Sequence, residues 1–220
     1  MDSATCLAIA QRDGFEATAL TVDYGQRHRV EIECARVLAR ARGVHDHRVV
    51  QVGLREIGGS ALTGPAAVPK DRPRETIGAH IPITYVPARN TMLLSLALGL
   101  AEVVGAGVIY IGATAVDYSG YPDCRPEFLR AFEALARLGT ARGIRGDSFE
   151  IRAPLIALSK AEIARLGTAL GIDYGQTSSC YDPTPEGVPC GRCDACLLRE
   201  KGFAEAGLVD PIQTRSGRKD

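Results

Sequence analysis

The sequence predicts an α/β protein, a doubly wound parallel sheet that carries a small cysteine-rich segment near its C-terminal end. Segments typical of strands alternate with segments typical of helices, which is the order expected of a parallel sheet with helices on both faces. The chain of 220 residues is 45% hydrophobic, enough for a substantial core. Its 26 basic and 26 acidic residues balance, which argues against a broad surface for nucleic acid or membrane.

The first half of the chain is expected to open on a helix. Asp2 or Ser3 could cap this helix, which runs to about Gln11. Apolar patterning then predicts strands over residues 15–22 and 48–52, with a helix over 29–42 between them. Residues 53–87 are rich in Gly and Pro and form a long irregular connection, which in a compact domain is usually functional or mobile.

The second half repeats the alternation. We expect helices over residues 90–104, 126–142 and 159–170, and strands over 108–112 and 149–152. Asn90 could cap the first of these helices, and Ser159 with Glu162 forms a capping box for the last. The expected organisation is an α/β domain over 1–175, a metal-binding segment over 176–214 and a polar tail over 215–220.

Polar loops follow the expected strands, where ligands of parallel sheets bind. The first loop contains Asp23, Tyr24, Gly25, Gln26, Arg27 and His28. Arg89 and Asn90 at a helix start are a plausible anion site, although an ordinary cap with a solvated arginine would look the same. Lys160 could likewise contact phosphate or be solvated.

The densest polar loop covers residues 113–126. Its two carboxylates, arginine and tyrosines could recognise a ring with a guanine-like edge, because a carboxylate can accept from the ring N–H and the exocyclic amine. The residues concerned are Asp117, Tyr118, Asp123 and Arg125.

Four cysteines lie within seventeen residues: Cys180, Cys190, Cys193 and Cys196. The C-x9-C-x2-C-x2-C spacing allows four thiolates to converge on Zn²⁺, and four protein ligands leave no open position, so the zinc would be structural. The alternatives are a redox pair at Cys193 and Cys196, or disulfides. A redox pair normally sits near the start of a thioredoxin-like unit, and no apolar export signal opens the chain. Cys6, Cys34 and Cys124 are expected to be packed, reduced thiols.

Several strings of the chain, from residue 1 to about residue 198, resemble one known family. They are DSATCLAIA, DYGQRHRVEIECA, YVPARNTMLLSLALGLAE, DYSGYPDCRPEF, SKAEI followed by RLG, and the cysteine set that begins TSSCY. Together they resemble the 7-cyano-7-deazaguanine synthase family of queuosine biosynthesis, within the PP-loop ATP pyrophosphatase superfamily. DYSGYPDCRPEF and the cysteine set are the specific ones, whereas SKAEI is common to several relatives.

The resemblance implies an adenine nucleotide alpha hydrolase-like fold and a ligase that forms carbon–nitrogen bonds. Such an enzyme converts 7-carboxy-7-deazaguanine and ammonia to the nitrile, with ATP and Mg²⁺, through an adenylated intermediate and an amide. It also implies one structural Zn²⁺ per chain, a homodimer, a cytoplasmic location, and neither membrane nor direct nucleic-acid binding.

The resemblance also implies site residues. The ATP side would include Met1, Asp2, Ser3, Ala4, Thr5, Cys6, Leu7, Asp23, Tyr24, Gly25 and Gln26. Catalytic roles would fall to Arg89, Asn90, Asp117, Asp123 and Lys160, and substrate binding to Arg27, His28, Tyr118 and Arg125.

One departure from the family pattern concerns the start of the chain. Family members open with a buried strand and S-G-G-x-D-S, but here Met1 stands at the variable position before Asp2 and Ser3. We favour a start assigned at an internal methionine over a truncated product, because every later motif is intact. The 220-residue chain is expected to bind ATP weakly, and an affinity equal to that of an N-terminally extended form would refute this.

Three other functions remain open at this point. Another PP-loop ligase or a tRNA sulfur-transfer enzyme would need a catalytic cysteine pair and a basic RNA surface, which the sequence does not suggest. A zinc-knuckle module for RNA or protein would not require so large an α/β domain. A truncated, inactive member of the family would retain the fold and the zinc.

Overall fold

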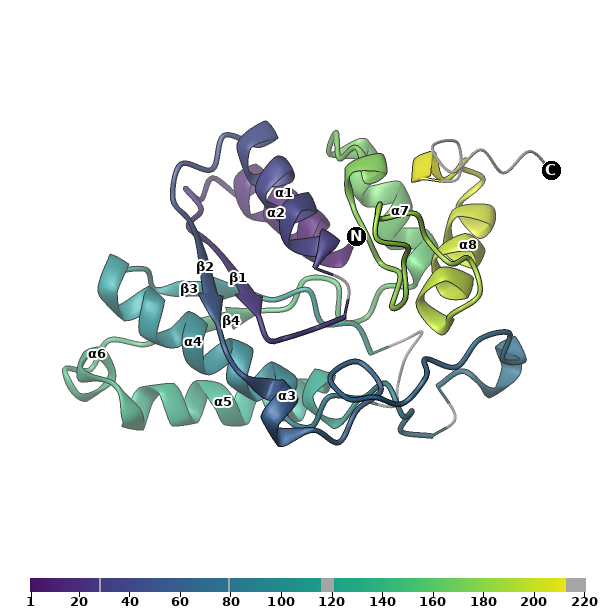
Figure 1. Ribbon diagram of the computed structural model, residues 1–220. Coiled ribbons are helices and arrows are strands. Elements are labelled where there is room, and N and C mark those ends of the chain that lie inside the picture. The colour runs from purple at the N-terminus through teal and green to yellow at the C-terminus, as the bar shows by residue number, and fades with distance from the viewer. Residues whose placement is uncertain (28, 79, 116–120, 213–220) are drawn as a thin grey trace.

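The structure, a computed structural model, describes residues 1–27, 29–78, 80–115 and 121–212. Helices lie on both sides of the strands (Figure 1). On one side are α1 (Asp2–Arg12) and α2 (Val30–Ala41), and on the other are α4 (Arg89–Val104) and α5 (Pro126–Gly139). The α/β class is therefore confirmed.

The described strands form two parallel pairs. In the first pair β1 (Ala19–Asp23) lies beside β2 (His47–Gln51), and α2 connects the two. In the second, β3 (Val108–Tyr110) lies beside β4 (Glu150–Arg152). Parallel strands were expected, but within the described part of the chain these pairs are separate two-stranded sheets and not one continuous sheet.

The largest apolar cluster holds the second strand pair between helices. Leu94 and Leu98 of α4 and Phe132 of α5 pack with Ile109 of β3 and Ile151 of β4, and all five are buried. Burying a side chain of this kind contributes about 1.5–3 kcal/mol. The expected apolar helix over residues 90–104 is therefore a core helix.

The C-terminal part is a pair of helices, α7 (Lys160–Ala169) and α8 (Asp194–Ala206), that pack against each other (Figure 1). The capping box at α7 is confirmed: the Ser159 backbone N–H donates to the Glu162 carboxylate at 2.8 Å, and the Ser159 hydroxyl accepts from the Glu162 N–H at 3.3 Å. Helix α8 was not expected. It begins among the cysteines, and its apolar residues are spread around the helix instead of forming one stripe.

Two expected helix caps were wrong. Helix α1 begins at Asp2, so Asp2 and Ser3 lie inside its first turn, and neither side chain caps it. Helix α4 begins at Arg89, with Ala88 in the capping position, so Asn90 also lies inside the helix. In both cases the side chain that the local sequence would place as a cap is bonded instead to a residue distant in the sequence.

Other boundaries shifted for local reasons. Strand β1 begins at Ala19, four residues later than expected. The helix expected over 126–142 breaks at Thr140, which has extended backbone angles. Its hydroxyl accepts from the Gly143 N–H at 2.9 Å and so starts a second short helix, α6 (Ala141–Ile144).

The connection over residues 53–87 is mainly irregular, as expected. It contains α3 (Leu54–Ile57) and the 3-10 turn η1 (Arg74–Thr76). Two further 3-10 turns, η2 (Pro122–Cys124) and η3 (Tyr174–Gln176), lie later in the chain. Among the described residues, no helix is long and apolar enough to cross a membrane.

Candidate functional site

Three loop tyrosines and the first residue of α4 form a tyrosine–arginine cluster, made of Tyr24, Tyr85, Tyr121 and Arg89. The Arg89 guanidinium hydrogen-bonds to the hydroxyl of Tyr24, which follows β1, and its Cζ lies 6.0 Å from the centre of the Tyr121 ring. Tyr85 stacks on Tyr121 with 5.7 Å between ring centres. Arg89 is therefore half-buried among aromatic rings and is not the solvated arginine of the alternative interpretation.

The protonation of this cluster is fixed by its packing. Burial raises the pKa of the Tyr24 hydroxyl, and the neighbouring Arg89 charge opposes that rise only in part. Tyr24 is therefore a neutral phenol, and Arg89 provides the charge. An aromatic surface with one cation beside it suits a flat heteroaromatic ring, because such rings stack on tyrosine and interact with guanidinium groups.

The start of α4 is held by Asp123. The Asp123 carboxylate accepts from the Asn90 backbone N–H at 2.8 Å, and the Asn90 side-chain amide donates to the Asp123 carbonyl oxygen at 3.0 Å and to the Cys124 Sγ at 3.1 Å. Asn90, Asp123 and Cys124 are all buried. The protein's own carboxylate thus occupies the helix end that the sequence suggested for an anion. The residue before the helix, Ala88, has a φ of +52°, an uncommon conformation for a residue with a side chain.

The loop after β1 is closed by its own side chains. Asp23 accepts from the Gly25 N–H at 3.2 Å and from Arg29 at 2.6 Å. The Gln26 side chain accepts from the Tyr24 N–H at 2.8 Å and donates to Glu31 at 2.8 Å. Because Asp23 and Gln26 are buried and engaged in this way, they shape the loop that presents Tyr24.

Asp2 and Lys160 meet where α1 and α7 begin. Lys160 Nζ lies 2.6 Å from one carboxylate oxygen of Asp2, in a partly buried ion pair. The other oxygen of Asp2 is buried and has no hydrogen-bond partner in the described part of the chain. The pair therefore joins residues far apart in sequence and leaves one acceptor available to a donor or a cation.

The four predicted cysteines converge. Their Sγ atoms all lie within 4.8 Å of one another, and Cys180 and Cys193 are almost fully buried. A tetrahedral site with Zn–S bonds of about 2.3 Å separates its sulfurs by about 3.8 Å, so the four thiols fit such an ion. Backbone N–H groups point at the sulfurs as well: the N–H groups of Asp182 and Cys190 donate to Cys180 Sγ at 3.3 and 3.2 Å. Donors of this kind favour the thiolates that a metal needs.

The long connection over residues 53–87 contacts this cysteine segment through a β-bridge, a backbone hydrogen bond and ion pairs. Lys70 forms a β-bridge with Cys193, and the Asp71 N–H donates to the Arg192 carbonyl oxygen at 2.8 Å. Ion pairs join the same two segments: Lys70 with Asp182, Asp71 with Arg192, Arg72 with Asp194, and Arg74 with Glu200. We call residues 70–74 the anchor segment.

Two of the remaining cysteines, Cys6 and Cys124, are unsuited to redox or sulfur-transfer chemistry. None of the seven cysteines, all of which lie in the described part of the chain, is in a disulfide. Burial raises the pKa of Cys6 to about 12, and burial together with the Asp123 carboxylate raises the pKa of Cys124 to about 11. Reactive cysteines have lowered pKa values, so these two thiols stay protonated near neutral pH.

Comparison with known proteins assigns the family. The chain matches the family described as "Queuosine biosynthesis protein QueC" over residues 1–207. The chain belongs to the QueC family. It is 61% identical to the 7-cyano-7-deazaguanine synthase of Myxococcus xanthus over 213 residues, which is 97% of this chain and 93% of that protein. The proteins of the same name from Geotalea daltonii and Paramagnetospirillum magneticum are 61% and 57% identical, over 96% and 98% of this chain and 91% and 95% of their own lengths.

Several predicted site residues of this QueC-family chain lie outside the tyrosine–arginine cluster. Ala4, Thr5 and Cys6 are buried in α1, where Thr5 pairs with the Tyr174 hydroxyl at 2.7 Å. Met1, Ser3 and Leu7 lie beside them, at or within the first two turns of α1. Arg125 sits at the start of α5 and donates to the Pro122 carbonyl oxygen at 3.1 Å. His28, Asp117 and Tyr118 are outside the described residues.

Sequence reasoning did not single out Tyr85 and Tyr121, which stack on each other in the structure. Tyr85 stands near the end of the Gly- and Pro-rich connection and Tyr121 in the polar loop over residues 113–126, and their stacking depends on bringing these two segments together. The visible signal was an aromatic residue near the end of each loop, which by itself does not distinguish a stacking surface from ordinary packing.

Proposed function

We propose that this QueC-family chain converts 7-carboxy-7-deazaguanine and ammonia to 7-cyano-7-deazaguanine with ATP. One observation carries the proposal: relatives about 60% identical over nearly the whole chain are named 7-cyano-7-deazaguanine synthase. The tyrosine–arginine cluster supports it, since its aromatic faces and single cation suit a deazapurine ring.

The chemistry requires two activations, because neither a carboxylate nor an amide has a good leaving group. In the first, the carboxylate oxygen attacks the α-phosphorus of ATP and pyrophosphate leaves. Ammonia then displaces AMP and gives the amide. In the second, the amide oxygen takes the adenylyl group from another ATP, and loss of AMP and a proton leaves the nitrile. Mg²⁺ supplies charge neutralisation for the phosphates.

Described residues support an assignment of these tasks. Lys160, held at 2.6 Å from Asp2, is the proposed phosphate contact at the start of α1, on the ATP side of the site. Arg89 is the proposed cation beside the ring, and Asn90 and Asp123 keep the start of α4 in place. The proposed residues of the substrate side remain Arg27, His28, Asp117, Tyr118 and Arg125, and those of the adenosine side remain Asp23 to Gln26.

The cysteine cluster is proposed to hold one structural Zn²⁺. The four sulfurs fit a tetrahedral ion with no open position, so the metal would stabilise the segment without taking part in the reaction. Bound there, it would fix the loop that carries Cys180 against the tyrosine–arginine side of the molecule, because Tyr24 and Cys180 share one apolar cluster.

The finer architecture is also a proposal. Helices on both faces of two parallel strand pairs support a single doubly wound PP-loop sheet over residues 1–175, followed by a zinc-binding segment over 176–214 and a tail over 215–220. A homodimer and a cytoplasmic location rest on the family resemblance, and sedimentation velocity would reveal a monomer if the first is wrong.

The test is a product assay on the purified chain. Incubation with 7-carboxy-7-deazaguanine, ammonium, Mg²⁺ and ATP should yield amide and then nitrile by mass spectrometry, together with AMP and pyrophosphate. Leaving out ATP or ammonium should leave the acid unchanged. Formation of ADP and phosphate would contradict the adenylated intermediate, and no amide or nitrile even at saturating ATP would contradict the proposed function.

A further inference from the structure

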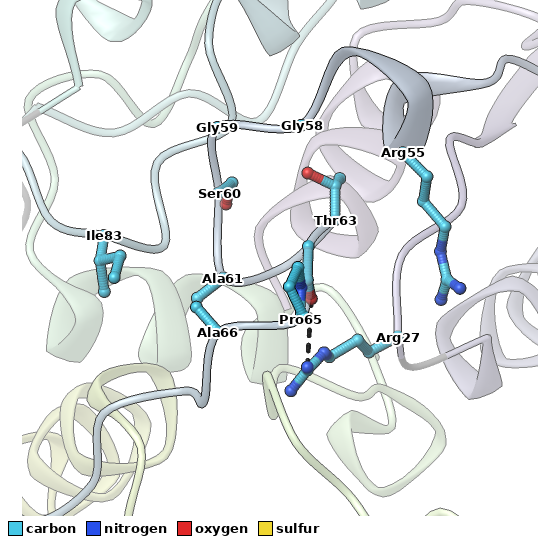
Figure 2. Close-up of a pocket in the computed structure, with 11 residues that line it drawn as sticks. Arg27, Arg55, Gly58, Gly59, Ser60, Ala61, Thr63, Pro65, Ala66 and Ile83 are labelled. Carbon is cyan, nitrogen blue, oxygen red and sulfur yellow. Dashed lines mark hydrogen bonds between the residues drawn. The ribbon is translucent and has the colours of Figure 1, made fainter.

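A pocket of about 750 Å³ lies beside the loop over residues 58–66, which we call the loop-58 pocket (Figure 2). This loop follows α3 in the long connection. Arg27, from the segment after β1, and Arg55, from α3, complete one side, and Ile83 contributes to the wall. None of the cysteine ligands and none of the tyrosine–arginine cluster lines this pocket.

The pocket is positively charged. Among the described residues that line it, two are arginines and none is acidic, and neither arginine takes part in an ion pair with any described residue. Backbone oxygens hold both side chains in place. Arg27 Nη2 donates to the Gly64 carbonyl oxygen at 3.1 Å, and Arg55 Nε donates to the Gly25 carbonyl oxygen. Each guanidinium has five N–H donors, so several remain for a ligand.

A buried hydroxyl gives the second, independent observation. Thr63 lines the pocket and is only 5% exposed, yet its Oγ1 has no hydrogen-bond partner in the described part of the chain. The nearby Ser60 hydroxyl, in contrast, accepts from the Leu62 N–H at 3.1 Å. An unpaired buried hydroxyl costs about 1–3 kcal/mol, so such a group is seldom left without a reason.

We propose that the loop-58 pocket binds an oxyanion, a carboxylate or a phosphate group, carried by an organic ligand. Arg27 and Arg55 provide the positive charge, and the Thr63 hydroxyl donates a hydrogen bond to the same ligand. Ala61, Pro65 and Ile83 offer apolar wall to the ligand's body. Guanidinium groups suit both anions, because their planar N–H donors match two oxygens at once.

Binding is measured by isothermal titration calorimetry without ammonia, so that turnover plays no part. The choice of probes rests on the proposed function: 7-carboxy-7-deazaguanine, 7-deazaguanine, which has the same ring without the carboxylate, and ATP with Mg²⁺. The variants are Arg27→Gln and Arg55→Gln, with Arg130→Gln on the exposed face of α5 as the matched control.

If the pocket binds a carboxylate, each arginine variant should raise the Kd of 7-carboxy-7-deazaguanine about tenfold or more, because a charge-assisted hydrogen bond is lost. The Kd of 7-deazaguanine and of ATP would then not change. If the pocket binds a phosphate instead, the same rise in Kd should be seen for ATP alone. Wild-type protein that binds neither anion, or variants that bind both within twofold of wild type, would overturn the proposal.

Thr63→Val keeps the test decisive if an arginine variant fails to fold. Valine has nearly the shape of threonine without the hydroxyl. We expect it to raise the midpoint of thermal unfolding of the ligand-free protein, since an unpaired polar group is removed, and to weaken the same anion severalfold. Unchanged anion binding by a more stable Thr63→Val protein would count against the hydroxyl and the site. The product assay reports separately on the proposed function.

Discussion

Replacing Cys193 with serine is expected to abolish zinc binding and to destabilise the whole C-terminal part of the chain. Cys193 is fully buried and stands in the residue position just before α8, and its Sγ lies within 4.8 Å of the other three sulfurs. Structural zinc contributes about 10–16 kcal/mol in isolated zinc fingers, so even a fraction of this, at least ~4 kcal/mol, is a large effect here. For a chain of this size, that would lower the melting temperature by about 8–16 °C.

Two measurements check this result. Plasma emission spectrometry of the wild-type protein should give one zinc per chain, and the variant should give almost none; calorimetry should show the lower melting temperature. Cys34→Ser is the matched control, because Cys34 lies on α2 and is not one of the four clustered cysteines. A Cys193→Ser protein with full zinc content and an unchanged melting temperature would show that the four cysteines do not form a structural metal site.

Replacing Arg199 with methionine is expected to cost about 3–5 kcal/mol of unfolding free energy. Arg199 and Asp210 form a buried ion pair, with side chains 5% and 3% exposed and hydrogen bonds of 2.7 and 2.8 Å. Arg199 also donates to the carbonyl oxygens of Tyr174 and Thr177. Methionine would leave the Asp210 carboxylate buried without its counter-ion and would remove the Arg199 donor from the Thr177 carbonyl oxygen, whereas the Tyr174 carbonyl oxygen would still accept from Thr177.

Urea unfolding followed by circular dichroism would measure the loss. Arg74→Met, which breaks the exposed ion pair with Glu200, is the control and should show only a small fraction of the change. The double variant Arg199→Met with Asp210→Leu should recover part of the loss, because no unpaired charge stays buried. An Arg199→Met protein as stable as the Arg74→Met control would mean that the ion pair of Arg199 with Asp210 does not stabilise the C-terminal part of the chain.

The sequence was most informative where local chemistry alone decides the structure. The capping box at Ser159 and the spacing of the four cysteines both specify their structures over a few residues, and both predictions agree with the geometry. The expected strands and helices also lie close to the observed ones, because apolar periodicity persists over each element.

Predictions failed where distant residues compete for the same group. Asn90 is a good capping residue by type, but Asp123 lies 33 positions along the chain and supplies the acceptor instead. The loop-58 pocket could not be foreseen, since its charge comes from arginines on two different elements and its unpaired hydroxyl is visible only in three dimensions. Whether the strands form one sheet likewise depends on pairing between segments, which periodicity does not specify.

The anchor segment changes the thermodynamics of the long connection. Fixing the backbone of an irregular segment costs about 1–2 kcal/mol per residue, and a strand ladder or a helix normally offsets that cost. Apart from α3, the η1 turn and the bridge from Lys70 to Cys193, the described part of residues 53–87 has no such regular structure. Its order depends instead on contacts with the cysteine segment, and Leu62, beside the loop-58 pocket, packs in the same apolar cluster as Val68 and Cys193. If the four cysteines hold the proposed zinc, loss of the metal would loosen these contacts, and we expect residues 53–87 and the wall of the loop-58 pocket to lose order with it.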